Sequence, residues 1–145
     1  MPELPEVETT RRGIEPHLLG EKILAATVRN PQLRWPIPKS LPQRIQGHTI
    51  RAIERRAKYL LIRLDGGTLI IHLGMSGSLR VIDRETAYRK HDHFSLELGT
   101  GKQLRLHDPR RFGAVLWKKG DVSQQALLES LGPEPLSEEF NGHYL

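Results

Sequence analysis

Short apolar runs separated by glycine-containing turns place the strongest constraint on the fold of this chain. Two pairs of runs each flank such a turn: Tyr59–Leu64 and Thr68–Leu73 around Asp65-Gly66-Gly67, and Phe94–Leu98 and Gln103–Leu106 around Gly99-Thr100-Gly101-Lys102. This arrangement is typical of β-hairpins. Further runs begin at Ile23 and occupy Ser78–Ile82 and Ala114–Trp117. The pattern predicts a mainly β chain, folded as a β-sandwich or barrel, and argues against alternating strands and helices.

Helical signals lie on both sides of this β pattern. Near the start, Pro5 suits a first helical position, and Gly20 is a suitable stop. The apolar residues between them recur at near-helical spacing: Leu4, Val7, Ile14 and Leu18. A second helix is predicted at Ser123–Leu131, whereas the proline-rich stretch Pro31–Pro42 is predicted to be a loop.

A length of 145 residues suits one domain. We expect this domain to span residues 1–132, and residues 133–145 to begin a linker. The chain has no cysteine, which excludes disulfides, thiolate chemistry and cysteine-ligated metal centres within it. No apolar run approaches the ~20 residues that span a bilayer, and the glutamate-rich start is unlike a signal peptide. The composition predicts a soluble, cytoplasmic protein without a membrane partner.

Positive charge is concentrated in the first four-fifths of the chain. All 22 lysines and arginines lie within residues 1–119, against 12 of the 17 acidic residues. Two segments hold most of the excess: Arg51–Arg63 has five basic residues and one acid, and Lys102–Lys119 has six and one. A basic face of this kind indicates a polyanionic partner, most often nucleic acid, although a solvated basic surface would look the same.

The first residues offer an unusual nucleophile. Removal of Met1 would leave Pro2 as a free secondary amine, with a pKa of about 7.7–8.0 against about 10.4 for a lysine. A secondary amine that attacks a carbonyl or a sugar C1′ gives an iminium, which serves as an electron sink. Glu3 and Glu6 lie close enough in sequence to move protons. Ordinary capping of a helix would place the same residue types here.

Histidines and acids suggest a second kind of chemistry. His91 and His93 would share one face of a strand, and three further candidates are near in sequence: Asp92, His107 and Asp108. This composition could ligate a metal ion. Lys58, just before a strand, could bind a phosphate or share in proton transfer. Alternatively, Lys58 is a surface lysine with its stem on a sheet, and the two histidines have this spacing by chance.

Two loops combine features suited to damaged or distorted DNA. Residues 108–113 present Arg110 and Phe112 beside a glycine, and residues 74–77 offer Met75 as an apolar tip. Arginine can replace a base edge and an apolar side chain can wedge between base steps, so such residues could fill the hole left by a flipped base. Alternatively, Met75 and Phe112 are core residues beneath their loops.

Four segments together resemble one known family. In chain order they are Pro2-Glu3-Leu4-Pro5-Glu6-Val7-Glu8-Thr9, Arg55-Arg56-Ala57-Lys58-Tyr59-Leu60, His72-Leu73-Gly74-Met75-Ser76-Gly77 and Asp108-Pro109-Arg110-Arg111-Phe112-Gly113. Their order and spacing are similar to those of bacterial formamidopyrimidine-DNA glycosylase. The resemblance implies a bifunctional base-excision-repair enzyme that excises 8-oxoguanine and formamidopyrimidines from double-stranded DNA and then cleaves the abasic strand as an AP lyase. For this half it implies a β-sandwich with the N-terminal helix packed against it.

The resemblance also implies a role for each candidate residue. Pro2 would form a Schiff base at the sugar C1′, Glu3 would help to open the sugar ring, and Glu6 would support the amine. Lys58 would donate a proton in β-elimination and contact a phosphate. The remaining candidates would bind DNA: Met75, Arg110 and Phe112 in the gap left by the flipped nucleotide, with Arg110 facing the orphaned cytosine, and His72 and His91 on the backbone.

Family members are longer than this chain, and their second half carries a helix–two-turn–helix element and a four-cysteine zinc finger. We therefore expect this chain itself to hold no zinc or other cofactor. With one wall of the DNA cleft, it should bind DNA weakly and in a salt-sensitive way, and excise little or no damaged base. We expect a monomer in the bacterial cytoplasm, associated with the nucleoid.

Two alternatives stay open from the residues alone. One is a non-catalytic β-sandwich that binds DNA through its basic face. The other is a metal-dependent phosphoesterase that uses His91, His93 and Asp108. Borohydride reduction on abasic DNA separates the first from an enzyme, because only the enzyme leaves an adduct at Pro2. Sensitivity to EDTA would identify the second.

Overall fold

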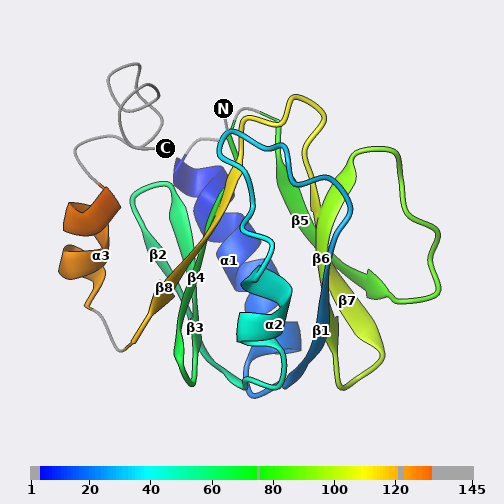
Figure 1. Cartoon of the computed structure of the whole chain (residues 1–145), viewed down its shortest axis with the longest axis horizontal. Helices are drawn as coiled ribbons and strands as arrows, with labels where there is room; N and C mark the ends of the chain where they lie inside the picture. Colours follow the sequence, from blue (N-terminus) through cyan, green and yellow to red (C-terminus); the bar gives the residue numbers. More distant parts are fainter. Residues whose placement is uncertain (1–3, 75, 121–122, 132–145) are drawn as a thin grey trace.

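The computed structural model describes residues 4–74, 76–120 and 123–131 (Figure 1). The helices are α1 (Leu4–Leu18), α2 (Leu41–Ile45) and α3 (Gln124–Leu131); the strands are β1 (Ile23–Val28), β2 (Ile50–Arg56), β3 (Tyr59–Leu64), β4 (Gly67–His72), β5 (Ser78–Asp83), β6 (Asp92–Leu98), β7 (Lys102–His107) and β8 (Ala114–Lys119). None of these helices is long and apolar enough to cross a membrane. Pro2, Glu3, Met75 and the linker predicted at residues 133–145 lie outside the described residues.

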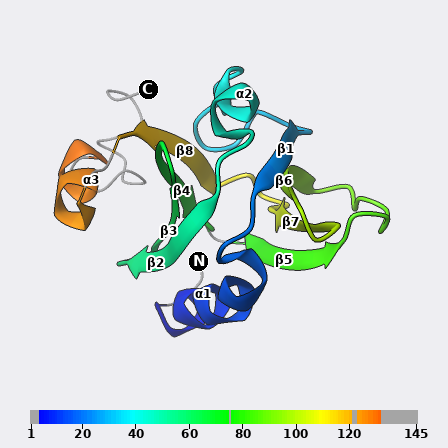
Figure 2. The ribbon, with the colours of Figure 1, turned by 90° about the horizontal axis from the view of Figure 1, so that it is seen from below.

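The strands form two antiparallel sheets that face each other, in the orders β1-β6-β7-β5 and β2-β3-β4-β8 (Figure 2). Successive residues of a strand point to opposite faces of its sheet. In β3, Leu60 and Ile62 therefore belong to the core between the sheets, whereas Tyr59 and Leu61 pack outside it with Leu127 of α3. Both predicted hairpins are present, as β3–β4 and β6–β7. The mainly β prediction is confirmed, and two separate sheets decide for the sandwich over the barrel.

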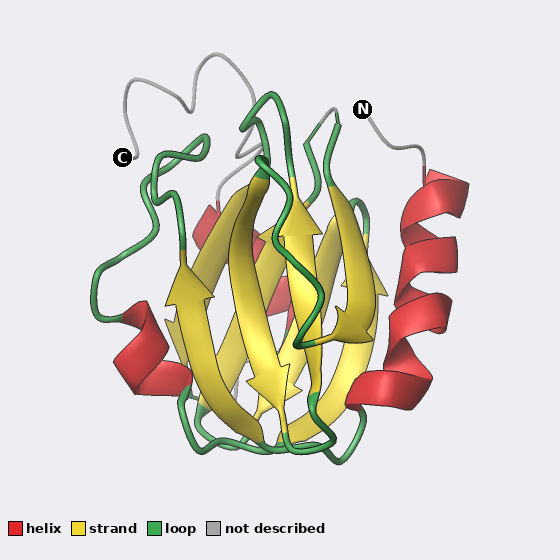
Figure 3. Cartoon of the chain, turned by 90° about the vertical axis from the view of Figure 1, so that its right-hand side faces the viewer, coloured by secondary structure: helices red, strands yellow, loops and turns green. Residues whose placement is uncertain are grey.

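Helix α1 lies along one open side of the sandwich, against β2 and β5 (Figure 2 and Figure 3). Its residues Val7, Ile14 and Leu18 are buried in the core that the two sheets share. The chain leaves the helix through Gly20, whose φ of 84° is in the left-handed region that glycine adopts without strain. The expected N-terminal helix packed against the sandwich is therefore confirmed.

The region between β1 and β3 differs most from the prediction. Pro31–Pro42 is irregular only as far as Ser40, where the chain enters α2, a helix too short to show a helical period in the sequence. The sequence pattern also gives no strand at Ile50–Arg56, yet β2 forms there. A register shift between Ile50 and Ala52 places the buried residues Ile50 and Ile53 three apart instead of two, which hides the strand period.

Two neighbouring leucines at the end of α1 test how this helix is held. Leu18 is fully buried and Leu19 is 50% exposed. We expect Leu18→Ala to lower the free energy of unfolding by about 2–5 kcal/mol, because it leaves a cavity in the shared core. Leu19→Ala should change it by no more than about 0.5 kcal/mol. Urea denaturation of both variants measures the difference, and equal effects would contradict this packing.

Candidate nucleic-acid interface

Three connections meet at one end of the β2-β3-β4-β8 sheet, at the top of Figure 1. Tyr59 of β3 pairs with His72 of β4, and His72 pairs with Ala114 of β8. Because these residues share one row of the sheet, the β2–β3 turn, the loop after β4 (residues 73–77) and the loop before β8 (residues 108–113) emerge side by side. The fold thus brings together segments that are far apart in the sequence.

The carboxyl group of Asp108 fastens two of these loops to each other. Its Oδ1 accepts hydrogen bonds from the Ser76 hydroxyl and the Arg111 N–H, both at 3.1 Å, and its Oδ2 accepts one from the Gly113 N–H at 2.7 Å. The Ser76 hydroxyl oxygen in turn accepts from the Arg110 N–H at 3.3 Å. Asp108 is 0% exposed. Its oxygens are therefore used inside the protein, and the carboxyl group positions the loops.

The same two loops touch backbone to backbone. A Cβ atom added at Gly74 would lie 2.5 Å from the carbonyl carbon of Phe112, and one at Gly113 would lie 2.6 Å from the carbonyl oxygen of His72. Real Cβ atoms do not approach backbone this closely. Gly74 also has a φ of 65°, a conformation that side chains disfavour. Both glycines are therefore required for the loops to meet.

Arg110 and Phe112 lie at the tip of the loop before β8. The Arg110 guanidinium carbon is 4.9 Å from the centre of the Phe112 ring, a cation–π distance. Arg110 is exposed and Phe112 is half-buried, outside the main core cluster. The alternative in which Phe112 is a core residue is therefore wrong; Met75, its expected counterpart, lies outside the described residues.

Two residues at this end adopt backbone conformations that only glycine adopts freely. Ala57, in the β2–β3 turn, has a φ of 51°, and Arg111 has a φ of 58°. Each precedes or follows a candidate residue directly: Ala57 comes before Lys58, and Arg111 comes after Arg110. Residues held in this region cost of order 1–3 kcal/mol and concentrate at functional sites.

His72 is a neutral histidine at the centre of this end. Burial and the nearby cations Lys58 and Arg34 lower the pKa of His72 from 6.5 to about 4. Its Nδ1 accepts a hydrogen bond from the Gly74 N–H at 2.9 Å, so the ring proton is on Nε2. Its ring also packs edge-on against Tyr59, with centroids 5.1 Å apart. Because only 3% of His72 is exposed, it offers a partner at most the edge of its ring.

The first turns of α1 are joined to β2 near the same end. Glu8 accepts hydrogen bonds from Arg11 and Arg12 of its own helix, at 2.8 Å each, and from Arg55 of β2 at 3.1 Å. Arg11, then Arg12 and Arg55, lower the pKa of Glu8 to about 2. This role of Glu8 was not predicted from the sequence, although basic residues three and four positions later are a detectable signal. Glu6, two positions earlier in α1, is exposed.

The histidine arrangement differs from the expected metal site. Strand β6 begins at Asp92, so His91 lies in the turn before the strand and not on one strand face with His93. The His93 Nε2 is 2.9 Å from the Asp108 carbonyl oxygen, and the Asp108 carboxyl group is occupied as described above. Among residues 4–74, 76–120 and 123–131, no group of three or more histidines, cysteines and acids is placed to hold a metal ion.

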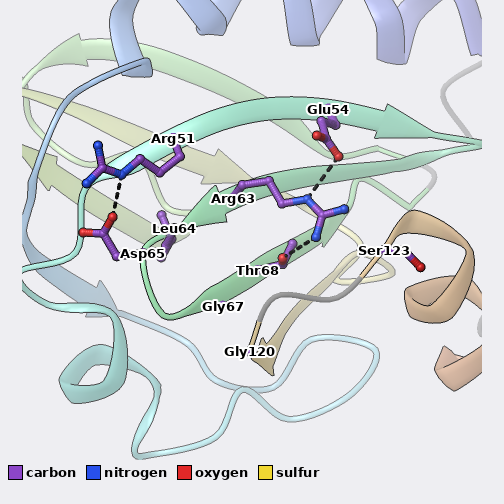
Figure 4. Close-up of a pocket in the computed structure, with 9 residues that line it drawn as sticks. All are labelled: Arg51, Glu54, Arg63, Leu64, Asp65, Gly67, Thr68, Gly120 and Ser123. Atoms are coloured by element: carbon purple, nitrogen blue, oxygen red, sulfur yellow. Dashed lines mark hydrogen bonds and ion pairs between the residues drawn. The ribbon is translucent and has the colours of Figure 1, made fainter.

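A depression of about 520 Å³ lies on the outer face of the same sheet, at its opposite end (Figure 4). Arg63 donates to Glu54 at 3.0 Å and to the Thr68 hydroxyl at 2.9 Å, and Arg51 pairs with Asp65. The charged side chains that line the depression are therefore paired with each other. The length of a six-residue strand, about 17 Å, separates the turn at Asp65 from the end that carries the three loops. The depression is therefore not part of the candidate interface.

The domain is a basic β-sandwich with a helix on its open side. At one end of it, two loops meet closely because each has a glycine at the point of contact. Residues 1–115 match the model of the formamidopyrimidine-DNA glycosylase N-terminal domain, and the chain belongs to that family. The resemblance seen in the four sequence segments is thus confirmed.

Similar proteins cover this chain well, but the chain covers only part of them. It is 59% identical over all 145 residues to the formamidopyrimidine-DNA glycosylases of Thioalkalivibrio sulfidiphilus and Stutzerimonas stutzeri, and spans 54% and 53% of their lengths. Lactococcus lactis FPG, solved with DNA that contains Fapy-dG, matches 89% of the chain at a TM-score of 0.78 and 34% identity. MutM, solved with DNA that contains carbocyclic 8-oxo-G, matches 90% at 0.78 and 32%. The chain spans 48% and 47% of these two structures.

Because Asp108 accepts three hydrogen bonds, replacement of its carboxyl group should destabilise the fold. We expect Asp108→Asn to lower the free energy of unfolding by about 1–3 kcal/mol, because an amide group brings a donor against N–H groups that need an acceptor. Amide chemical shifts of residues 73–77 and 108–113 should move together. Asp83→Asn, at an exposed ion pair with Lys102, should cost less than about 1 kcal/mol. A stable Asp108 variant with unshifted loops would refute this role.

His72 predicts a pH dependence of stability. Since the unfolded chain binds this proton below about pH 6.5 and the folded chain binds it only below about pH 4, the folded state loses stability as pH falls through this interval. We expect a loss of about 2 kcal/mol from His72 between pH 7 and pH 5. His72→Gln should remove it in urea titrations at both values, whereas His17→Gln, at an exposed position of α1, should leave it. An unchanged pH dependence in His72→Gln would contradict the assignment.

Proposed function

We propose that this chain is the nucleophile-bearing half of a bifunctional DNA glycosylase and AP lyase, which excises oxidised purines from double-stranded DNA during base-excision repair. The family match over residues 1–115 carries the proposal. Related structures hold DNA with Fapy-dG and with carbocyclic 8-oxo-G, which supports lesions of this type as substrates. Such an enzyme acts in the bacterial cytoplasm, at the nucleoid.

The proposed chemistry starts at Pro2 once Met1 has been removed. The secondary amine attacks C1′ of the damaged nucleotide, the bond from C1′ to the base breaks, and the base leaves with a proton. Glu3 assists the opening of the sugar ring, and Glu6 supports the amine. The product is an iminium that joins the Pro2 nitrogen to C1′. An α-amine suits this step because a substantial fraction of it is unprotonated near neutral pH, in contrast to an ordinary lysine.

Strand cleavage follows by β-elimination. The iminium acidifies C2′; loss of a C2′ proton then expels the 3′ phosphate by breaking the C3′–O bond. In this proposal Lys58 contacts a phosphate and donates a proton. The structure supports a role for Lys58 through its place in the strained turn between β2 and β3, close enough to His72 to lower the pKa of that histidine.

In the proposal, the loops keep the reacting nucleotide flipped out of the duplex. Arg110 and Phe112, with Met75, fill the gap left by the flipped nucleotide, and Arg110 faces the orphaned cytosine. The exposure of Arg110 and the anchoring of its loop through Asp108 support this assignment. His72 and His91 contact the backbone.

The remaining family machinery is not carried by these residues. A zinc site with four thiolate ligands does not fit this chain, because the sequence contains no cysteine. With fewer phosphate contacts than a two-sided cleft provides, the chain alone binds DNA weakly and excises little damaged base.

Covalent trapping tests the proposed nucleophile. We expect the Met1-free chain, incubated with abasic duplex DNA and borohydride, to form an adduct that maps to Pro2 by mass spectrometry. The same chain acetylated at its N-terminus should form none, because an amide nitrogen has no nucleophilic lone pair. Trapping should continue in EDTA. A bound but untrapped duplex would support the non-catalytic alternative, and cleavage that EDTA abolishes would support a phosphoesterase.

A further inference from the structure

The segment between β5 and β6, residues 84–91, connects the far end of the sandwich with the candidate interface. It runs up the right-hand side of Figure 1. At its start the Arg84 N–H donates to the Gly101 carbonyl at 3.1 Å, in the β6–β7 turn. At its end the His91 carbonyl accepts from the Asp108 N–H at 3.0 Å. The segment is therefore tied directly to the loop that carries Arg110.

A tyrosine flanked by two arginines fixes the middle of this segment. The guanidinium carbons of Arg29 and Arg105 lie 4.4 Å and 4.0 Å from the centre of the Tyr88 ring. Both are cation–π distances. The Tyr88 hydroxyl is 3.0 Å from the Ser95 hydroxyl and donates to the Gln103 side-chain oxygen at 3.3 Å. Tyr88 is thereby held on the sheet through its ring and through its hydroxyl group.

Arg105 is an unusual anchor because it is 0% exposed and, among the residues the structure describes, forms no ion pair. Its Nε donates to Gln103 at 2.9 Å, and its Nη1 and Nη2 donate to the carbonyls of Ala87 and Arg84 at 3.2 and 3.3 Å. Burial of a cation without a carboxylate is costly. Two of these three hydrogen bonds go to the backbone of residues 84–91, so Arg105 acts as a fastening point for that segment.

Two exposed cations follow the stack. The backbone of Arg89 is fixed on both sides, because its N–H donates to Asp92 at 2.7 Å and its carbonyl accepts from Arg29 at 3.0 Å. The side chains of Arg89 and Lys90 are exposed, and neither makes an ion pair among the described residues. Asp92, the nearest acid along the chain, is buried against Arg80 and His107.

We propose that the Arg29–Tyr88–Arg105 stack holds residues 84–91 so that Arg89 and Lys90 bind phosphates of the DNA duplex beyond the lesion. This inference rests on the proposed function. It extends the interface from the three loops over the outer face of the second sheet, where residues 84–91 are bonded to side chains of β6 and β7. Because the backbone of Arg89 is already fixed, binding orders the side chains and not the segment, and each phosphate contact releases counterions. The contacts carry no sequence information and act on damaged and undamaged DNA alike.

Charge removal at two places tests the contacts. Arg89→Gln/Lys90→Gln should weaken binding to undamaged and abasic duplexes about tenfold at low salt, and lower the slope of log Kd against log salt by about 1–2. The matched control is Lys118→Gln/Lys119→Gln, which removes the same charge from the exposed end of β8, opposite the interface. It should leave Kd within about twofold. Fluorescence anisotropy measures both, and equal effects of the two double variants would overturn the proposal.

Substitution of Tyr88 tests the positioning role. Tyr88→Leu removes the ring that both arginines contact and should reproduce the lower salt slope. Tyr88→Phe keeps the ring and should retain the wild-type slope, although it loses two hydrogen bonds. Loss of stability without a change of slope in Tyr88→Leu would show a purely structural role and refute this step.

The outcomes separate this inference from the proposed function. Normal borohydride trapping at Pro2 together with an unaltered salt slope in Arg89→Gln/Lys90→Gln would refute the phosphate contacts and still support the proposed enzyme. A wild-type chain that binds no duplex at any salt concentration would overturn the phosphate contacts, whatever the trapping shows.

Discussion

The architecture of the candidate interface depends on one buried carboxyl group. Asp108 accepts hydrogen bonds from the loop after β4 and from its own loop, while its backbone contacts His91 and His93. Loops are normally the least defined part of a β-sandwich, because they lack the ladder bonds of the strands. Here a single acceptor provides the missing bonds, and two glycines allow the backbones to come close enough to use it.

Positive charge is handled in two different ways within this domain. Arg11, Arg12 and Arg55 converge on Glu8, and Arg105 is buried beneath residues 84–91. Arg11, Arg55 and Arg105 join different segments of the structure to each other, and Arg12 pairs with Glu8 within α1. The side chain of Arg110, by contrast, is exposed at the loop end, with its guanidinium over the Phe112 ring. The net charge of the chain therefore does not show which basic residues stabilise the fold and which are exposed to a partner.

Much of the fold could be predicted from local sequence, because glycine-containing turns fix hairpins and helical spacing fixes α1. Strand β2 could not, since its register shift and its arginines hide the alternation of buried residues. The site shows the same division. The loops that carry Arg110 and Gly74 were identifiable one at a time, but their meeting depends on the pairing of β4 with β8. Asp108 was considered as a metal ligand, because no sequence pattern reveals which backbone groups a carboxyl group will meet.

Both non-glycine residues with positive φ in the described chain are at the loop end, at Ala57 and Arg111. Each is a place where the polypeptide is held in a conformation that it would leave if its neighbours allowed it. A selection for heat resistance alone would favour glycine or asparagine at these two positions. Such a variant would melt later, yet it would hold Lys58 and Arg110 less firmly, so greater thermal tolerance would come with a less ordered candidate interface.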